Sequence, residues 1–273
     1  MFAIWGLSPL YFALINHVPA FEVMVHRVIW AVPMVGLYAA MTGQWGAVRA
    51  VGRSRRGMAV MAMAAAMVSI NWFVFVYAIQ TGRTAEASFG YYIYPLLAVV
   101  LGALVFRERI TGLQRGAAAL AAVGVLGIAI ARGTPPWIAL IVACSFAIYG
   151  AIRKSSSVGP LVGVFWELIL MTPPMLLYLA WISGGVFGAD MGTSLLLVGC
   201  SFFTAVPLII YVEVTKILEF STVGVLFYLN PTLQFISALL LGEALSMGEV
   251  GAFGIIWIGV AIYCYDLLRR RRS

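Results

Sequence analysis

Long apolar runs separated by short polar segments dominate the pattern of hydrophobic and polar positions along this chain. The runs lack the period-two alternation of a β-strand, and most of them reach the roughly 20 apolar residues that a helix needs to cross a bilayer. A transmembrane β-barrel would need short alternating segments instead. The pattern therefore predicts helices, over the ranges 2–16, 21–42, 58–82, 85–106, 112–132, 135–152, 159–183, 192–216, 219–241 and 247–267.

The amino-acid composition is typical of an integral membrane protein. Of its 273 residues, 63% are apolar and 10% are charged, and the mean hydropathy is +1.02. Ten spans would use about 200 residues, which leaves no stretch for a soluble catalytic domain. Cys144, Cys200 and Cys264 lie inside apolar runs without disulfide or metal-ligand spacing. We expect an all-α integral membrane protein of about ten transmembrane helices, with no metal and no cofactor.

The net charge is +7. The distribution of the basic residues along the chain indicates orientation in a membrane and not nucleic-acid binding. If the N-terminus is cytoplasmic, the loops on that side hold 14 of the 17 Lys and Arg residues, including the closing run Arg269 to Arg272. The opposite loops hold only Arg83 and Arg132, and Arg27 lies within the second span. This asymmetry follows the positive-inside rule. It places both termini in the cytoplasm of a bacterial-type inner membrane, with the lipid bilayer as a partner.

An internal repeat appears when the chain is compared with itself at a shift of 135 to 136 residues. Pro95 then corresponds to Pro231, and Glu108 corresponds to Glu243. Five spans is an odd number, so the second copy must be inverted relative to the first. We expect two five-helix repeats, residues 1–134 and 135–273, the second with a basic C-terminal tail. Inverted repeats of this kind are typical of secondary transporters, whose substrate binds near the midplane where the halves meet.

Several short stretches carry a resemblance to a known family. They are Trp5-Gly6-Leu7-Ser8-Pro9-Leu10-Tyr11-Phe12, His26-Arg27-Val28-Ile29-Trp30, Asn71-Trp72, Tyr91-Tyr92-Ile93-Tyr94-Pro95 with Glu108-Arg109, and Asn230-Pro231-Thr232-Leu233-Gln234-Phe235 with Gly242-Glu243. Through them the whole chain resembles the RarD-type branch of the EamA drug/metabolite transporter superfamily, and it is similar to YddG-type exporters. The resemblance implies ten helices around a central cavity and export of small metabolites, with aromatic or other neutral amino acids as the expected cargo.

Ionisable residues inside the spans are the first candidates for function. A charged side chain in a span is costly, so it faces the protein interior or water by default. His26 and Arg27 could contact a substrate carboxylate or form a proton-sensitive gate. Alternatively, Arg27 ties helices together by pairing with Glu22 or Glu86. Glu167 could bind a proton or an amine, and we consider it the candidate for proton coupling.

Polar and aromatic residues near the repeated prolines are the candidates for substrate binding. A proline in a span removes a backbone hydrogen bond and kinks the helix. Amide and phenol groups at the same depth would find no hydrogen-bond partner if they faced lipid. They could hydrogen-bond a substrate or hold helices together. The predicted substrate-binding residues near the prolines are Ser88, Tyr91, Tyr92, Pro95, Tyr228, Asn230 and Gln234. Aromatic and amide side chains of other spans are added to them as candidates for the cavity: Trp5, Asn71, Tyr77 and Trp166.

Three classes of function compete for this sequence. A secondary transporter working by alternating access explains the inverted repeat, and its cargo is either amino acids or drug-like amphipathic compounds. An intramembrane enzyme would need clustered histidines or acids, yet the only histidines are His17 and His26. A membrane scaffold leaves the paired prolines unexplained. The sequence therefore predicts a transporter, a monomer or weak homodimer, and not an enzyme.

Overall fold

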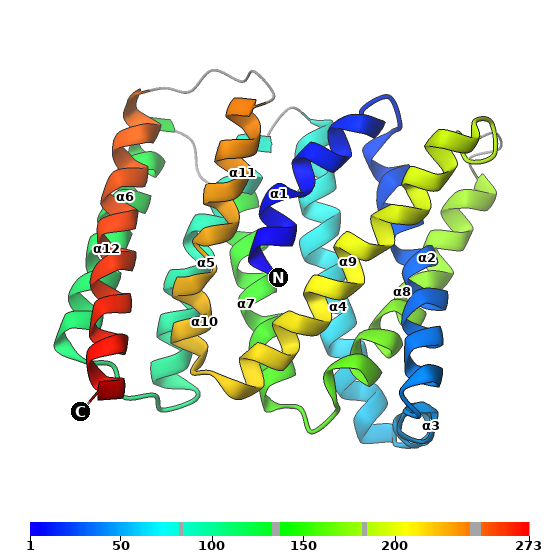
Figure 1. Cartoon of the computed structure of the whole chain (residues 1–273), viewed down its shortest axis with the longest axis horizontal. Helices are drawn as coiled ribbons and strands as arrows, with labels where there is room; N and C mark the ends of the chain where they lie inside the picture. Colours follow the sequence, from blue (N-terminus) through cyan, green and yellow to red (C-terminus); the bar gives the residue numbers. More distant parts are fainter. Residues whose placement is uncertain (82–83, 133–136, 182–184, 241–246, 273) are drawn as a thin grey trace.

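The computed structural model is helical through nearly all of the chain that it describes, which is every residue except 82–83, 133–136, 182–184, 241–246 and 273. Most helices stand side by side and run up or down across the view of Figure 1. Within the described residues there is no β-strand, and the one β-type pairing is an isolated bridge between Phe187 and Asp190. The all-α expectation is confirmed for the described part of the chain.

Helix occupies each of the ten ranges that the hydrophobic pattern predicts. The elements are α1 (Phe2–Phe12), η1 (Ala13–Ile15), α2 (Ala20–Met41), α3 (Trp45–Arg53), α4 (Arg55–Gln80), α5 (Thr84–Leu104), α6 (Gly112–Arg132), α7 (Trp137–Ser155), α8 (Pro160–Trp181), α9 (Met191–Ile217), α10 (Phe220–Leu226), α11 (Leu229–Leu240) and α12 (Met247–Arg272). Among the described residues, α2, α4, α7, α8 and α9 contain stretches long and apolar enough to cross a membrane, and α1 with η1, α5 and α6 contain shorter apolar helices.

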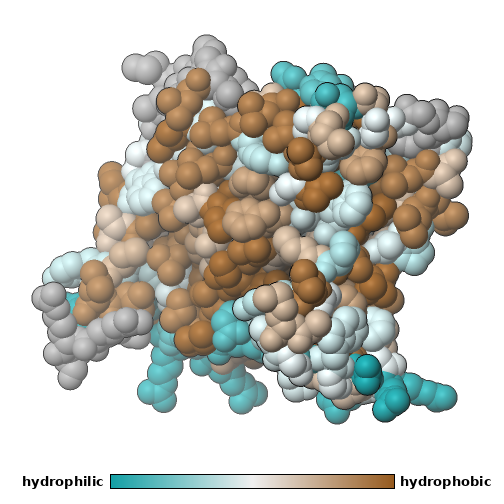
Figure 2. Space-filling model, turned by 45° about the vertical axis from the view of Figure 1, so that its right-hand side comes forward, coloured by the Kyte–Doolittle hydropathy of each residue, from teal (hydrophilic) through white to brown (hydrophobic). Residues whose placement is uncertain are grey.

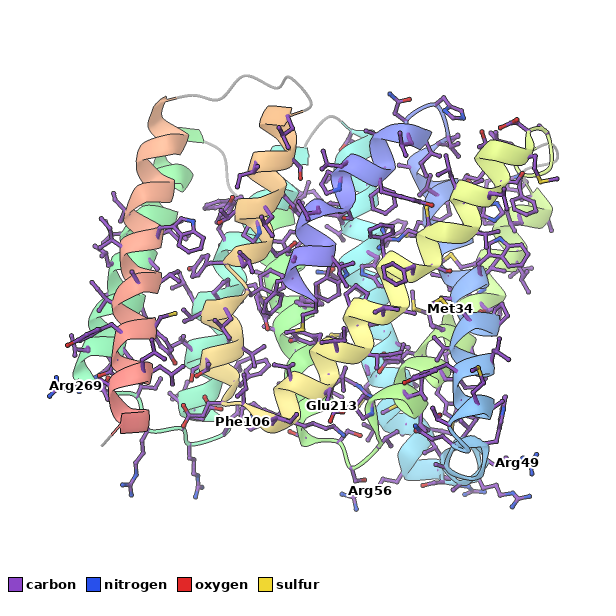
Figure 3. All side chains as sticks on the ribbon, in the orientation of Figure 1. Met34, Arg49, Arg56, Phe106, Glu213 and Arg269 are labelled. Atoms are coloured by element: carbon purple, nitrogen blue, oxygen red, sulfur yellow. The ribbon has the colours of Figure 1, made fainter. Side chains whose placement is uncertain are left out.

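The outer surface has the character of a protein dissolved in lipid. Hydrophobic side chains cover the middle of the face seen in Figure 2, while hydrophilic ones gather mainly along its lower edge. Trp181, Met41 and Leu104 are among the most exposed large apolar side chains. Arg49 and Arg269 lie at the same lower end of the bundle in Figure 3. A multi-pass membrane protein presents this kind of surface, with an apolar band bordered by basic groups.

A short helix lies in the basic segment after α2, where we expected only a loop. This helix, α3, is amphipathic: Val48 is buried, whereas Arg49 is exposed. The Val48 carbonyl accepts a hydrogen bond of 3.0 Å from the Trp166 indole of α8. With nine residues, α3 is too short and too polar to register as an apolar run, which is why the pattern missed it.

The range 219–241, which we expected to form one helix, is divided into α10 and α11 at Phe227 and Tyr228. Pro231 has no N–H to donate to the carbonyl four residues earlier, that of Phe227, which accepts the Asn230 N–H at 2.9 Å instead. Pro95, the corresponding residue of the first half, lies inside a helix that continues without a break. The two repeated prolines therefore have different local consequences.

Helix packing follows a corresponding pattern in the two halves of the chain. α5 packs against α7, and α11 packs against α1. In the same way α4 contacts α8 and α7, while α9 contacts α2 and α1. α2 packs on α8, α5 packs on α10, and α6 pairs with α12 at one side of the bundle (Figure 1). Exchanging the helices of one half for those of the other leaves this set of main contacts unchanged.

Candidate functional site

Aromatic side chains from both halves meet between α1, α5, α7, α9 and the α10–α11 break. Tyr94 and Phe227 have ring centroids 4.5 Å apart, and those of Phe146 and Tyr211 are 5.0 Å apart. The hydroxyl groups of Tyr94 and Tyr211 are hydrogen-bonded at 2.8 Å. We call this group the central aromatic cluster; its members are Trp5, Tyr94, Phe146, Tyr149, Tyr211 and Phe227.

Two predicted site residues lie at this cluster. Trp5 belongs to it, with ring contacts to Phe146 and Phe227, and its indole donates to the Phe203 carbonyl at 3.1 Å. Tyr91 adjoins it, 5.9 Å from Phe227 between ring centroids. These rings pack against one another in the present conformation, so a substrate could enter only if the helices that carry them moved apart.

Tyr92 and Tyr228, which correspond to each other in the predicted internal repeat, each contact the segment that carries the other. The Tyr92 hydroxyl donates to the Pro231 carbonyl at 3.4 Å, and the Tyr228 hydroxyl donates to the Tyr92 carbonyl at 3.3 Å. Both side chains are buried. Pro95 is also at this interface, where its carbonyl lies close to Gly224 of α10. These predicted residues therefore join the two halves.

The remaining candidates around the prolines differ in what they contact. Asn230 is buried, and its side-chain oxygen accepts a hydrogen bond of 3.2 Å from the Gln234 amide one turn later. Gln234 is half-buried. The side chain of Ser88 lies outside the described residues.

Three predicted residues are not brought together with the central aromatic cluster. Asn71 donates to the Val142 carbonyl at 2.7 Å and so joins α4 to α7. Trp166 is bound to α3, as described above. Tyr77 is exposed and has a ring contact with Trp137. For these three the structure favours helix-to-helix contacts over a shared lining.

Arg27 is held among helices from both halves. Its Nε donates to the Thr204 hydroxyl of α9 at 2.8 Å. The guanidinium carbon is 5.1 Å from the ring centroid of Phe12 and 5.6 Å from that of Trp72. Among the described residues, Arg27 therefore contacts neighbouring helices through a hydroxyl and two aromatic faces, and not through an ion pair. The side chain of Glu86, one of the expected partners, lies outside the described residues.

His26 and Glu22 fasten the α8–α9 loop to α2. The Glu22 carboxylate accepts the Val186 N–H at 2.7 Å, so this expected partner of Arg27 is engaged elsewhere. The His26 ring stacks on Phe187 with centroids 4.7 Å apart, and its Nε2 is 3.9 Å from Glu22. Both His26 and Glu22 are buried. The arrangement closes this end of α2 beneath the loop.

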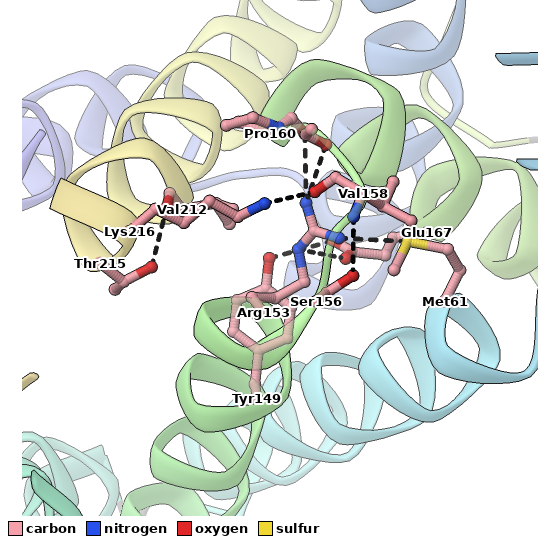
Figure 4. Close-up of polar contacts among 11 residues, drawn as sticks. Met61, Tyr149, Arg153, Ser156, Val158, Pro160, Glu167, Val212, Thr215 and Lys216 are labelled. Carbon is pink, nitrogen blue, oxygen red and sulfur yellow. Dashed lines mark hydrogen bonds and ion pairs between the residues drawn. The ribbon is translucent and has the colours of Figure 1, made fainter. Parts of the chain in front are cut away.

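A buried ion pair joins α7 to α8 near the opposite end of the bundle (Figure 4). The Arg153 Nε is 3.1 Å from a Glu167 oxygen, and the two side chains are 0% and 1% exposed. The Tyr149 hydroxyl donates to the other Glu167 oxygen at 3.0 Å, which connects the pair to the central aromatic cluster. Arg153 also donates to the Met61 sulfur of α4 and to the Gly159 carbonyl.

Comparison with known proteins places this architecture in a family. The EamA-like transporter family matches residues 1–130. Protein RarD of Streptomyces exfoliatus is 34% identical over 99% of this chain and 88% of its own length, and Protein RarD of Escherichia coli is 34% identical over 98% and 93%. The chain belongs to the EamA-like transporter family. Within it, this is a RarD-type member of the drug/metabolite transporter superfamily.

Two further similarities extend over almost the whole of this EamA-like chain. An uncharacterized transporter of Bacillus subtilis, YojE, is 35% identical over 100% of the chain and 93% of its own length. A solved crystal structure matches 99% of the chain and 95% of its own with a TM-score of 0.77 at 21% identity, which shows a shared fold. The apolar helices and the family therefore agree on a multi-pass membrane transporter.

Sequence reasoning overlooked part of the site in this EamA-like transporter. Phe146 and Phe227 are not among the predicted site residues, although both are buried in the central aromatic cluster. Arg153 was counted only as a cytoplasmic loop residue. One signal could have found it: Arg153 lies only seven positions before Pro160, where α8 begins, so its long side chain is within reach of the first turns of α8.

Proposed function

We propose that this protein exports small metabolites by alternating access, with aromatic and other neutral amino acids as its cargo. Two inverted five-helix halves, residues 1–134 and 135–273, rock around a shared binding site. The proposal also includes ten spans in a bacterial-type inner membrane, with both termini on its cytoplasmic side. The observation that carries it is the reciprocal contact of Tyr92 and Tyr228 at equivalent positions of the two halves.

The corresponding helix contacts of the two halves support the inverted arrangement. A pair of equivalent residues can touch only near the axis that relates the two repeats, and transporters of this architecture bind substrate beside that axis. The central aromatic cluster adjoins the same place. Rocking of one half against the other would separate its rings, because Trp5 and Tyr94 belong to one half while Phe146 and Tyr211 belong to the other.

The chemistry of the cluster supports an amphipathic cargo. Ring faces and phenol hydroxyls contact an apolar body and hydrogen-bond its polar groups. Glu167 is the proposed proton carrier, since its carboxylate is buried and connected to the cluster through Tyr149. His26 is proposed as part of the gate at the other end, beneath the α8–α9 loop.

Counterflow in proteoliposomes tests the proposal. Purified protein is reconstituted into vesicles preloaded separately with aromatic amino acids, other neutral amino acids and unrelated amphipathic metabolites, and uptake of labelled compound is followed. Saturable exchange of aromatic or neutral amino acids is the expected result. Exchange restricted to drug-like compounds would support the transport activity but contradict amino acids as the cargo. No exchange of any compound by folded protein would contradict the proposal.

A further inference from the structure

Arg27 has an unusual environment for a cation inside a membrane span. Phe12 of α1, Trp72 of α4 and Thr204 of α9 hold its guanidinium group, so that both halves of the chain contribute. Thr204 occupies only Nε. The side chain is half-buried, and the two terminal nitrogens have no hydrogen bond to the part of the chain that the structure describes.

The charge of Arg27 is not compensated within the described part of the protein. No carboxylate there forms an ion pair with it, since Glu22 binds the Val186 N–H and lies beside His26. Tyr91 and Cys200, which are within electrostatic reach of the guanidinium, are neutral as phenol and thiol. A charge without a partner inside a span is costly. Arg153, which is buried near the end of α7, is by contrast paired with Glu167.

The geometry of Arg27 suits one class of ligand group. A guanidinium presents parallel N–H donors that match the two oxygens of a carboxylate. Because Thr204 holds Nε, the two terminal nitrogens of the guanidinium keep a fixed orientation. The flanking rings of Phe12 and Trp72 would contact an apolar part of the same ligand. A single cation among neutral groups balances one negative charge and leaves a phosphate dianion half-compensated.

We propose that Arg27 anchors the carboxylate of the transported compound, so that the cargo is an amphipathic monocarboxylate. This inference rests on the proposed transport function and specifies its substrate class. Thr204 is the positioning residue that orients the guanidinium. Because α2 carries Arg27 while α9 carries Thr204, a bound carboxylate would engage both halves through one contact.

Ligand-induced thermal stabilisation of the purified full-length protein tests the anchor separately from transport. The probes are matched pairs that differ only at the acid: phenylalanine and phenylalanine amide, phenylacetate and phenylacetamide, and indole acetate and its amide. We expect the intact protein to prefer the acids by about tenfold or more in apparent affinity, as for a charged hydrogen bond. Arg27→Gln should abolish this preference while the amides still bind.

Arg49→Gln is the matched control, because Arg49 is an exposed arginine on α3 at the surface. It should leave the preference for acids unchanged. Thr204→Val keeps the charge and removes only its fixed orientation, so it should weaken the preference by a few fold, and it provides a second variant if Arg27→Gln does not fold. An equal response to acids and amides in the intact protein would overturn the anchor, as would a preference retained in folded Arg27→Gln. Acid-selective binding without counterflow would instead contradict the transport function alone.

Discussion

Arg153 and Glu167 form a buried ion pair whose two charges depend on each other. Their charges are almost completely removed from solvent, and a buried pair of this kind stabilises little in itself because desolvation offsets most of the attraction. Its loss is nevertheless expensive, since the remaining charge stays buried without a partner. Removing one partner should therefore cost more stability than the intact pair contributes.

Arg153→Met should lower the free energy of unfolding by about 3–5 kcal/mol, because Glu167 would remain buried and charged. Adding Glu167→Leu should recover much of this loss, since the second substitution removes the unpaired charge. Thermal unfolding in detergent measures both changes. A double variant no more stable than Arg153→Met would contradict this account of the pair.

Glu167→Gln should abolish proton-driven transport but leave exchange of substrate across vesicles intact. An amide retains an acceptor for the Tyr149 hydroxyl and loses the group that binds and releases a proton. The measurement compares counterflow with uptake driven by an imposed pH gradient, with Glu213→Gln, at an exposed acid on α9, as control. An unchanged response to the gradient would exclude Glu167 as the proton carrier.

Among the helices, the ends of α9 and α10 depend on carboxylates outside their own spans. Asp190 caps α9, where its side chain accepts the Thr193 N–H at 2.7 Å. Glu108, from the segment after α5, accepts the Phe220 and Ser221 N–H groups at the start of α10, and Ser221 also donates its hydroxyl. A carboxylate satisfies the unpaired N–H groups at a helix start and interacts favourably with the helix dipole.

Glu108→Gln should destabilise the protein by about 1–2 kcal/mol, because an amide supplies one acceptor oxygen and no charge where two carboxylate oxygens now accept hydrogen bonds. The loss should be localised to α10. Hydrogen exchange followed peptide by peptide should show faster exchange at residues 220–223 than in the parent. Equal protection across α10 in the two proteins would contradict the capping role.

Asp190 should make the start of α9 sensitive to acid. Hydrogen bonds from the backbone N–H and the side chain of Thr193 hold the pKa of the Asp190 carboxyl below its usual value. Its contribution to stability is therefore present above the ordinary pKa of an aspartate, and it is lost as the pH falls through the lowered one. Asp190→Asn keeps the cap and should remove the dependence on acid pH, which thermal unfolding between about pH 6 and pH 3 would reveal against the parent.

The sequence predicts the helices of this fold well and their contacts poorly. Every long apolar run contains helix because lipid leaves few other ways to satisfy the backbone. The break at Phe227 was harder to anticipate, since Pro95 leaves its own helix whole. Site prediction met a related difficulty: Trp5 lies in the central aromatic cluster, whereas Trp166 contacts α3. In a span that is apolar all round, residue spacing does not reveal which face meets which neighbour.

For the whole molecule, the basic side chains at one end of the bundle (Figure 3) predict its orientation in the membrane. A green fluorescent protein fused after residue 273 should fluoresce, and alkaline phosphatase at the same place should be inactive, because both report a cytoplasmic C-terminus. The two reporters placed in the α8–α9 loop should give the reverse. Active phosphatase at the C-terminus would invert the proposed topology.

The contact of Glu108 with the start of α10 has a consequence for how the protein is made. The acid and the N–H group of Phe220 are separated by 112 positions, so the ribosome delivers the carboxylate long before the helix end that it caps. Until then the segment between α5 and α6 carries a carboxylate with no helix start to bind. A gene split between the halves would have to supply both fragments together, because a carboxylate of the first fragment caps a helix of the second.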